Sequence, residues 1–196
     1  THFASRVSSS ILYNLKLNYK QSEKNHHTLS LFGLDAERFA LGYRSNRVAQ
    51  SDPMLQRDLI KGDFNNFGLE YKILLRRKIK YIQTVNLLGI KFYKSNNTST
   101  QGPGSDGVGP NFNFYSDLFP YYNNQSSYKY PNLNVSFFGE NIIYINKKFS
   151  ITPGFRYEKI ETKSNGNYVF VLVDGANNPI ANTIEYNKTD NNRDFI

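Results

Sequence analysis

Hydrophobic and polar residues alternate along Pro131–Glu161, PNLNVSFFGENIIYINKKFSITPGFRYEKIE, in two runs separated by a short polar segment. The apolar positions are Leu133, Val135, Phe137, Gly139, Ile143 and Ile145, followed by Phe149, Ile151, Phe155 and Tyr157. Because successive side chains of a strand point to opposite faces, this pattern predicts two amphipathic strands. Asn146–Lys148 is left for the turn. Such strands are typical of a transmembrane β-barrel, and a soluble sandwich or lipocalin-like barrel is the alternative.

The same alternation predicts four further strands: Val7–Tyr19, Thr28–Leu34, Phe67–Leu75 and Lys80–Lys94. In the last of these, Val85 and Leu87 fall on the polar face, which predicts a β-bulge. Charged residues such as Lys16 and Lys72 oppose the apolar positions. A lysine would be costly in a soluble core but costs little in a water-filled lumen. This difference favours the membrane barrel.

The predicted connections alternate between short and long. The short ones are Lys20–His27, Arg77–Ile79 and Asn146–Lys148, and the long ones are Asp35–Asp63, Ser95–Tyr130 and Thr162–Ile196. We expect a helical turn near Ala36–Leu41 and a hairpin in which Tyr168–Val173 pairs with Thr183–Tyr186. Membrane barrels have short periplasmic turns and long extracellular loops. About six strands cannot close a wide barrel, so we predict an all-β, antiparallel segment of a larger transmembrane barrel.

Composition narrows the function classes. The 196 residues contain no cysteine, which excludes disulfides and thiolate metal sites, and the 15 Tyr and 15 Phe suit the aromatic girdles of a membrane barrel. The net charge of +8 comes from dispersed Lys and Arg without a nucleic-acid-binding motif, so no nucleic-acid partner is expected. The longest apolar run, Val169–Val173, is too short for a transmembrane helix. Neither end carries a targeting signal, and we expect both to lie inside a longer protein.

Three stretches then resemble a known family. They are LGIKFYKSNNTSTQGPGSDGVGPNFNFYSD, the segment from Pro131 to Thr162, and RFALGYRSNRV with RDLIKGDFNNFGLEYKILLR. Together they resemble the barrel domain of TonB-dependent outer-membrane receptors over roughly Leu29–Lys163, and are most similar to ferric citrate receptors of Bacteroidetes-type bacteria. The pattern FxENIxxIxxKxSITPGxRYE, from Phe138 to Glu158, is specific for that superfamily and much less specific for a ligand.

The resemblance implies that residues 1–196 are part of a barrel of about 22 strands, without its plug domain and closing strand. It also implies a location in the bacterial outer membrane, in contact with lipid and lipopolysaccharide. The implied function is uptake of a ferric chelate such as ferric citrate or a siderophore, driven by the TonB complex through the missing plug. The alternative is import of a glycan, a peptide or another nutrient by the same barrel type, or a role as a component of a protein complex.

Arginines of the first long loop are the first candidate ligand residues. Arg44, Arg47 and Arg57 could bind an anionic chelate because guanidinium groups form bidentate hydrogen bonds with carboxylates. The alternative is that they pair with Asp52, Asp58 and Asp63 of the same loop or with lipopolysaccharide phosphates.

The glycine-rich segment QGPGSDGVGP lacks the strand-then-helix setting of a phosphate-binding loop, so we interpret it as a turn-rich loop. Its Gln101 and Ser105 are candidate ligand contacts near the lumen mouth. The tyrosines that follow suit the outer interfacial girdle better than a ligand site. They are Tyr115, Tyr121, Tyr122, Tyr128 and Tyr130.

Three charged residues are predicted to line the lumen. Arg156 and Glu158 share the polar face of one strand, and Glu140 lies on the polar face of its neighbour, which predicts a ladder of ion pairs. The three histidines do not form a convincing metal site, and a ferric chelate needs no protein ligands, so no metal or cofactor is expected. A hydrolase would need a Ser/His/Asp set at the loop end, whereas His26 and His27 fall in a predicted periplasmic turn. We therefore do not expect an enzyme.

Overall fold

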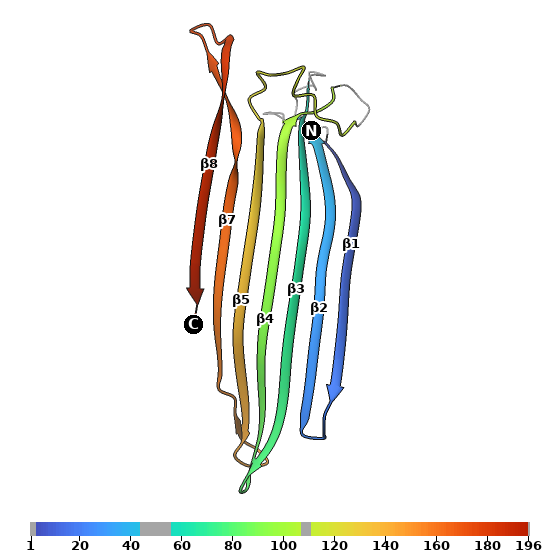
Figure 1. Ribbon diagram of the computed structural model, residues 1–196, viewed down its shortest axis with the longest axis vertical. Coiled ribbons are helices and arrows are strands. Elements are labelled where there is room, and N and C mark those ends of the chain that lie inside the picture. Colours follow the sequence, from blue (N-terminus) through green and yellow to red (C-terminus); the bar gives the residue numbers. More distant parts are fainter. Residues whose placement is uncertain (1–2, 44–55, 107–110, 196) are drawn as a thin grey trace.

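The chain forms one antiparallel sheet of long strands (Figure 1). The computed structural model describes residues 3–43, 56–106 and 111–195, and the side chains of the first strand from Ser10 onward. Over these ranges it contains eight strands and no helix, and so no helix that could span a membrane. The strands are β1 Phe3–Lys20, β2 Asn25–Gly42, β3 Asp58–Ile79, β4 Ile82–Pro103, β5 Ser126–Tyr144, β6 Ser150–Ile151, β7 Gly154–Val173 and β8 Pro179–Phe195.

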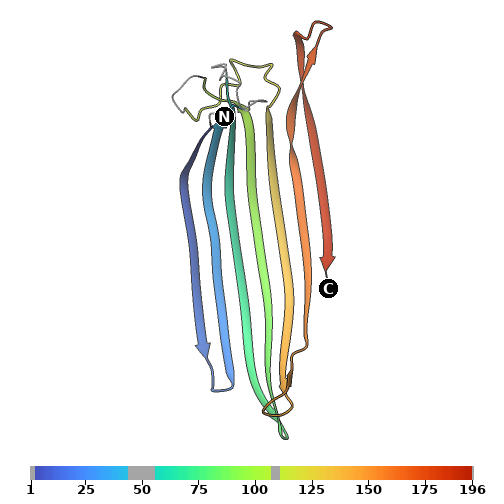
Figure 2. The ribbon, with the colours of Figure 1, turned by 180° about the vertical axis from the view of Figure 1, so that it is seen from behind.

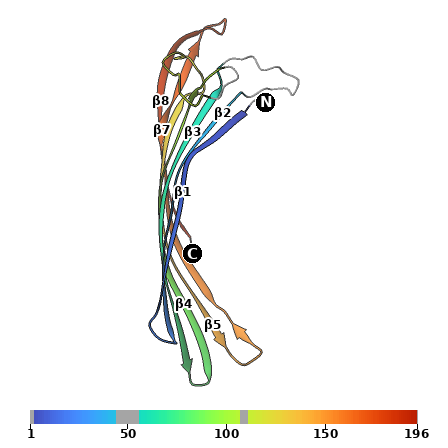
Figure 3. The same cartoon turned by 90° about the vertical axis from the view of Figure 1, so that its right-hand side faces the viewer.

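Strands adjacent in the sequence are also adjacent in the sheet, in the order β1-β2-β3-β4-β5-β7-β8 (Figure 2). The short β6 pairs with β5 in the register that β7 continues, with Ile143 opposite Ile151 and Glu140 opposite Gly154. Pro153 lies between β6 and β7 and has no amide hydrogen to donate. The sheet is not closed, and seen edge-on it is a single curved layer (Figure 3).

Residues 21–24, 80–81 and 145–149 form short connections at one end of the strands, the turn end, as the sequence predicts. At the other end, here called the loop end, β2 and β4 finish and β3 and β5 begin. The β7–β8 turn, residues 174–178, is short although it lies at the loop end, where a third long loop was predicted. The predicted turn at Asn146–Lys148 is confirmed: the Asn146 side chain accepts hydrogen bonds from the amides of Lys148 and Phe149 at 2.8 and 3.0 Å. Lys80, in the two-residue turn before β4, has a φ of 56°.

Several strand boundaries were predicted wrongly. Asp35–Gly42 continues β2 and pairs with β3 throughout, so the expected helical turn at Ala36–Leu41 is strand. The predicted turn at Arg77–Ile79 belongs to β3, and the register of β4 passes through Val85 and Leu87 without a bulge. Paired strands satisfy the backbone hydrogen bonds of these polar stretches, a tertiary effect that outweighs weak periodicity.

The predicted third long loop, Thr162–Ile196, is wrong over most of its described residues, which continue β7 and form β8 of the main sheet. The predicted pairing of Tyr168–Val173 with Thr183–Tyr186 is the outer part of this longer hairpin. β7 and β8 pair from Glu158 with Phe195 to Val173 with Pro179. This hairpin extends beyond the other strands at the loop end (Figure 1). At its tip, Asp174 accepts hydrogen bonds from the amides of Ala176 and Asn178 at 2.9 and 2.8 Å.

The sheet has almost no hydrophobic core. Among the side chains that the structure describes, the buried large hydrophobic ones are Leu41 and Leu59, both at the loop end. Elsewhere large apolar side chains are open, such as Ile90 and Phe137, each 46% exposed. One layer of strands has nothing to pack against, so its faces are left uncovered.

Aromatic rings cover glycines on neighbouring strands and partly replace a core. In each case the ring belongs to the residue directly opposite the glycine. The pairs are Tyr13 with Gly33, Phe32 with Gly68, Phe138 with Gly89, Phe155 with Gly139 and Tyr128 with Gly166. A Cβ at Gly68 or Gly89 would collide with the ring that lies over it, so glycine is required at these close approaches.

Candidate functional site

Two rows of side chains cross the middle of the sheet, one on each face. Each row consists of residues that are paired directly across neighbouring strands β1, β2, β3, β4, β5 and β7. The apolar row is Leu17, Leu29, Tyr71, Ile90, Phe137 and Tyr157. The polar row is Lys16, Ser30, Glu70, Lys91, Ser136 and Glu158. The rows define the apolar face and the polar face of the sheet.

Charges on the polar face are paired with one another and with aromatic rings. Glu70 forms an ion pair with Lys72 at 2.6 Å and lies opposite Lys91. Lys91 also lies over the Phe32 ring, 5.5 Å from its centroid. These contacts occupy one stretch of the polar face across β2, β3 and β4, where the alternation of strand residues places them together.

The predicted lumen-lining residues lie on this polar face. The Arg156 guanidinium donates to both carboxylate oxygens of Glu158, at 3.1 and 3.2 Å, and its carbon lies 5.8 Å from the Phe138 ring centroid. Asn134 also donates to Glu158, at 2.5 Å. Glu140 is exposed and lies opposite Gly154 rather than opposite either charge. The pair Arg156–Glu158 is therefore present, whereas Glu140 is not joined to it as the predicted ladder required.

Buried polar atoms gather on the polar face without protein partners. They include Asn66 Oδ1, Asn97 Oδ1, Asn132 Oδ1, Asn134 Oδ1, Ser136 Oγ and His26 Nε2. A buried polar atom without a hydrogen bond is costly, so such atoms are normally satisfied by water or by a polar partner. Their concentration here indicates a face that contacts water or polar groups.

A depression of about 340 Å³ lies on the polar face towards the loop end, around Asn97, Tyr130, Asn132 and Asn191. Tyr130 stacks on Tyr128, with ring centroids 6.1 Å apart. The sequence analysis missed this cluster and assigned both tyrosines to the outer girdle. Tyr128 and Tyr130 are separated from Asn132 and Ser136 by even numbers of residues along β5, so all four lie on the same face. The period of two along β5 was the signal that could have found it.

The loop that follows β4 is fixed by Asp58 at the start of β3. The Tyr122 hydroxyl donates to Asp58 at 2.8 Å, and the Asn124 amide donates to both carboxylate oxygens at 3.1 and 3.2 Å. Partial burial and the neighbouring Asp58 carboxylate raise the pKa of Tyr122 above its ordinary value. Asp58 therefore links Tyr122 and Asn124 to the start of β3.

Two predicted ligand contacts meet at the base of this loop. Arg57 is 7% exposed and Ser105 is 8% exposed. The Arg57 amide donates to the Ser105 carbonyl at 3.3 Å, and the Ser105 hydroxyl donates to the Asn111 carbonyl at 3.1 Å. This burial gives both residues a structural role at the loop base, and ligand contact by either of them stays a prediction.

The other candidate contacts are separate from this base. Gln101 lies on β4, opposite Ile60 and Ser126. Arg44 and Arg47 lie outside the described residues, so the predicted arginine cluster is represented by Arg57 alone. Within the described ranges, no group of three His, Asp or Glu residues could hold a metal ion.

Neither a scan against protein-family models nor a search of curated protein sequences finds a match to the chain. The resemblance to TonB-dependent receptors therefore stays a prediction.

Proposed function

We propose that this chain forms part of the wall of an outer-membrane transport barrel, with its apolar face in lipid and its polar face lining a water-filled lumen. The observation that carries the proposal is the pair of rows across the sheet. In each of six strands, a residue of the apolar row is adjacent in sequence to a residue of the polar row. This alternation suits a wall between lipid and water.

The dimensions of the apolar face support the same proposal. On β3 its apolar residues run from Phe67 to Leu75, about 27 Å of strand at about 3.4 Å per residue. The outward apolar band of membrane barrels is of the same order, about 25 Å. Towards the turn end, His27 lies between the rings of Tyr19 and Tyr71, with centroid distances of 5.9 and 6.1 Å. Aromatic residues at that margin fit a membrane interface.

A soluble sandwich is the competing architecture for the same strands. It would need a second layer to cover the apolar row, whereas the described residues form one layer with almost no buried large hydrophobic side chains. In a sandwich, one face of the sheet would pack into the core, and the other face would carry isolated surface charges. The polar face instead carries buried, unpartnered amide oxygens, which favour a water-filled lumen.

We further propose that the barrel takes up a small ligand, and a ferric chelate is the first candidate. This candidate rests on the resemblance to ferric citrate receptors and on the arginines between β2 and β3 in the sequence. An anionic chelate would be bound by such guanidinium groups, and TonB would supply the energy through a plug domain.

One observation favours a neutral, hydroxyl-bearing ligand as the second candidate. The depression beside Tyr130 contains the amide oxygens of Asn97 and Asn132, which have no partner and can only accept hydrogen bonds. A sugar brings hydroxyl donors and an apolar ring face that packs on tyrosine, whereas a fully ionised carboxylate ligand brings acceptors alone. Glycan import is therefore the alternative substrate class.

Cysteine labelling of the full-length protein tests the barrel wall. This part of the chain has no cysteine, so a cysteine at position 90 or 91 reports on one face only. After reconstitution in lipid vesicles, a fluorophore on Ile90→Cys should be quenched by a lipid-dissolved nitroxide, and Lys91→Cys should react with a water-soluble maleimide. Equal quenching at both positions, or none at position 90, would overturn the proposed wall.

Calorimetry of the full-length protein in detergent separates the two ligand classes. If the chelate proposal is correct, ferric citrate should bind, and its binding should be weakened by Arg44→Ala or Arg47→Ala. If a neutral disaccharide binds and ferric citrate does not, and if Asn132→Leu weakens that binding, the substrate class is glycans. If neither ligand binds, both substrate proposals are wrong. The proposed barrel wall is then tested by the labelling experiment alone.

A further inference from the structure

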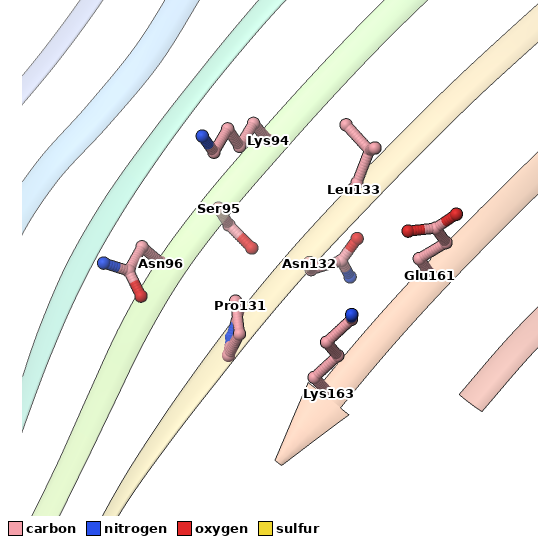
Figure 4. A pocket seen from close by; sticks show the side chains of 8 residues that line it. All are labelled: Lys94, Ser95, Asn96, Pro131, Asn132, Leu133, Glu161 and Lys163. Atoms are coloured by element: carbon pink, nitrogen blue, oxygen red, sulfur yellow. The ribbon is translucent and has the colours of Figure 1, made fainter. Parts of the chain in front are cut away.

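A shallow groove lies on the apolar face at the loop-side margin of the apolar residues (Figure 4). It has a volume of about 270 Å³ and is lined by residues of β4, β5 and β7, which include Lys94, Pro131, Leu133, Glu161 and Lys163. Lys94, Leu133 and Glu161 are paired directly across the three strands, so they share one face. Pairing of β5 with β7 is interrupted beside the groove, between Lys129 and Asn132, where Pro131 has no amide hydrogen to donate.

A lysine lies on each side of the groove, and two carboxylates lie near them: Glu161 lines the groove, and Asp190 on β8 is directly opposite Lys163. Lys94 on β4 and Lys163 on β7 are both exposed, and neither forms an ion pair with another described residue. The acidic residue of the groove, Glu161, is paired with Lys159 at 3.4 Å. The groove thus has an apolar floor formed by Pro131 and Leu133, with the Lys163 side chain beside it and the exposed Lys94 side chain extending from β4 toward β3 (Figure 4).

The apolar floor continues into the apolar face of the sheet. On β5, Leu133 is followed on the same face by Val135 and Phe137, which are 36% and 46% exposed. On β4 the neighbouring apolar residues are Phe92 and Ile90, paired with Val135 and Phe137. An amphiphile with an anionic head could therefore lie with its head between the lysines and its chain along these residues.

We propose that this groove binds the phosphate-bearing headgroup of a membrane lipid, with Lys94 and Lys163 contacting the phosphate and Leu133 contacting the start of an acyl chain. The site rests on the proposed function, because it needs the apolar face to lie in lipid. A lysine ammonium is a compact charge with three donors that suits phosphate oxygens. The continuous apolar surface below the lysines distinguishes a lipid from a free phosphate ion.

Lipid retention by the full-length protein tests the site. The protein in neutral detergent is titrated with phosphatidylglycerol or phosphatidylcholine and examined by native mass spectrometry. The anionic lipid should be retained preferentially, and Lys94→Gln and Lys163→Gln should each weaken its binding by about a factor of five, a typical contribution of one lysine to an anionic lipid surface. The matched control is Lys147→Gln, which removes one exposed positive charge at the turn end, outside the groove.

Three outcomes overturn the site. They are equal retention of the two lipids, the same loss in the Lys147→Gln control as in the groove variants, and displacement of the lipid by millimolar inorganic phosphate. The labelling result at Ile90 separates this failure from failure of the proposed function. If the fluorophore at position 90 is quenched but Lys94→Gln and Lys163→Gln retain the lipid as the parent does, only the groove proposal is wrong. If the fluorophore is not quenched, the proposed lipid-facing wall is wrong.

Discussion

Large hydrophobic side chains are buried at the loop end of the sheet and exposed in its middle. At the loop end, Leu41 and Leu59 are 2% and 0% exposed and lie under the segment that follows β4. In the middle, the apolar row remains open, with Ile90 and Phe137 each 46% exposed. The chain therefore covers apolar side chains itself at the loop end. In the middle of the sheet the apolar side chains can be covered only by the surroundings of the sheet. A membrane supplies that surrounding under the proposed function.

The largest effect is expected from Leu59→Ala. Deleting a fully buried leucine side chain removes its contacts and leaves a cavity, at a cost of about 2–5 kcal/mol in the free energy of unfolding. Urea unfolding of the full-length protein refolded in detergent measures this cost. Ile90→Ala is the control and should cost clearly less, since Ile90 is half exposed within the chain. Equal costs would mean that the loop end has no core of its own.

A charge placed in the apolar row should have the next largest effect. Ile90→Arg should destabilise the protein in lipid vesicles by about 2–4 kcal/mol, the cost of an arginine on the lipid face near the bilayer midplane. Tyr93→Arg adds the same charge to the polar face and should cost much less. Comparable losses for the two variants, measured by denaturant unfolding in vesicles, would contradict the assignment of the faces.

A smaller effect is expected from Tyr122→Phe, which removes the hydrogen bond to Asp58 and should cost about 0.5–1.5 kcal/mol. The raised pKa of Tyr122 adds a pH dependence, because its contribution is complete below the ordinary tyrosine pKa of 10.0 and is lost as pH rises towards the folded-state pKa. Unfolding measured from pH 9 upward should show this loss in the parent protein and a weaker one in Tyr122→Phe. Parallel pH profiles would argue against the Asp58 contact.

The smallest and most local effect is expected at the β7–β8 tip. Hydrogen bonds from the Asn178 and Ala176 amides lower the pKa of Asp174, so the contribution of this carboxylate is present above its ordinary pKa of 3.8 and is lost as pH falls through the lower folded-state value. The protection of the Ala176 and Asn178 amides from hydrogen exchange, measured relative to an unfolded chain at the same pH, should fall below about pH 4 while that of the loop base is unchanged. Asp174→Asn should remove the pH dependence of this protection.

Sequence alternation was sufficient to predict an antiparallel all-β sheet and parts of most of its strands, but about six strands were expected where the structure has eight. It worked best where apolar residues recur at every second position, as from Leu133 to Phe137. It failed along Asp35–Gly42 and at the start of β3, where polar residues occupy both faces of paired strands. There the strand is held by backbone pairing with its neighbours, which local residue patterns do not encode.

The candidate site was less accessible from sequence. Arg156 and Glu158 were placed together correctly because they are two residues apart on one strand. The burial of Arg57 and Ser105 could not be foreseen, because it depends on contacts between residues distant in the sequence, such as the hydrogen bonds that join Arg57 to Gly104 and Ser105. The cluster around Asn132 and Tyr130 joins side chains from β4, β5, β7 and β8, and its formation needs the register of all four strands.

The rings that lie over glycines have a consequence for how such a sheet is assembled. A slip of two residues between neighbouring strands would keep every side chain on its proper face, so the division into apolar and polar faces alone cannot prevent it. It would, however, move Phe32 off Gly68 and Phe138 off Gly89, and set each ring against a position that carries a side chain. The neighbouring pairs β1–β2, β2–β3, β4–β5 and β5–β7 thus each carry a check of their own alignment. At these pairs an error of register meets a steric clash between the two strands themselves, without help from the rest of the sheet.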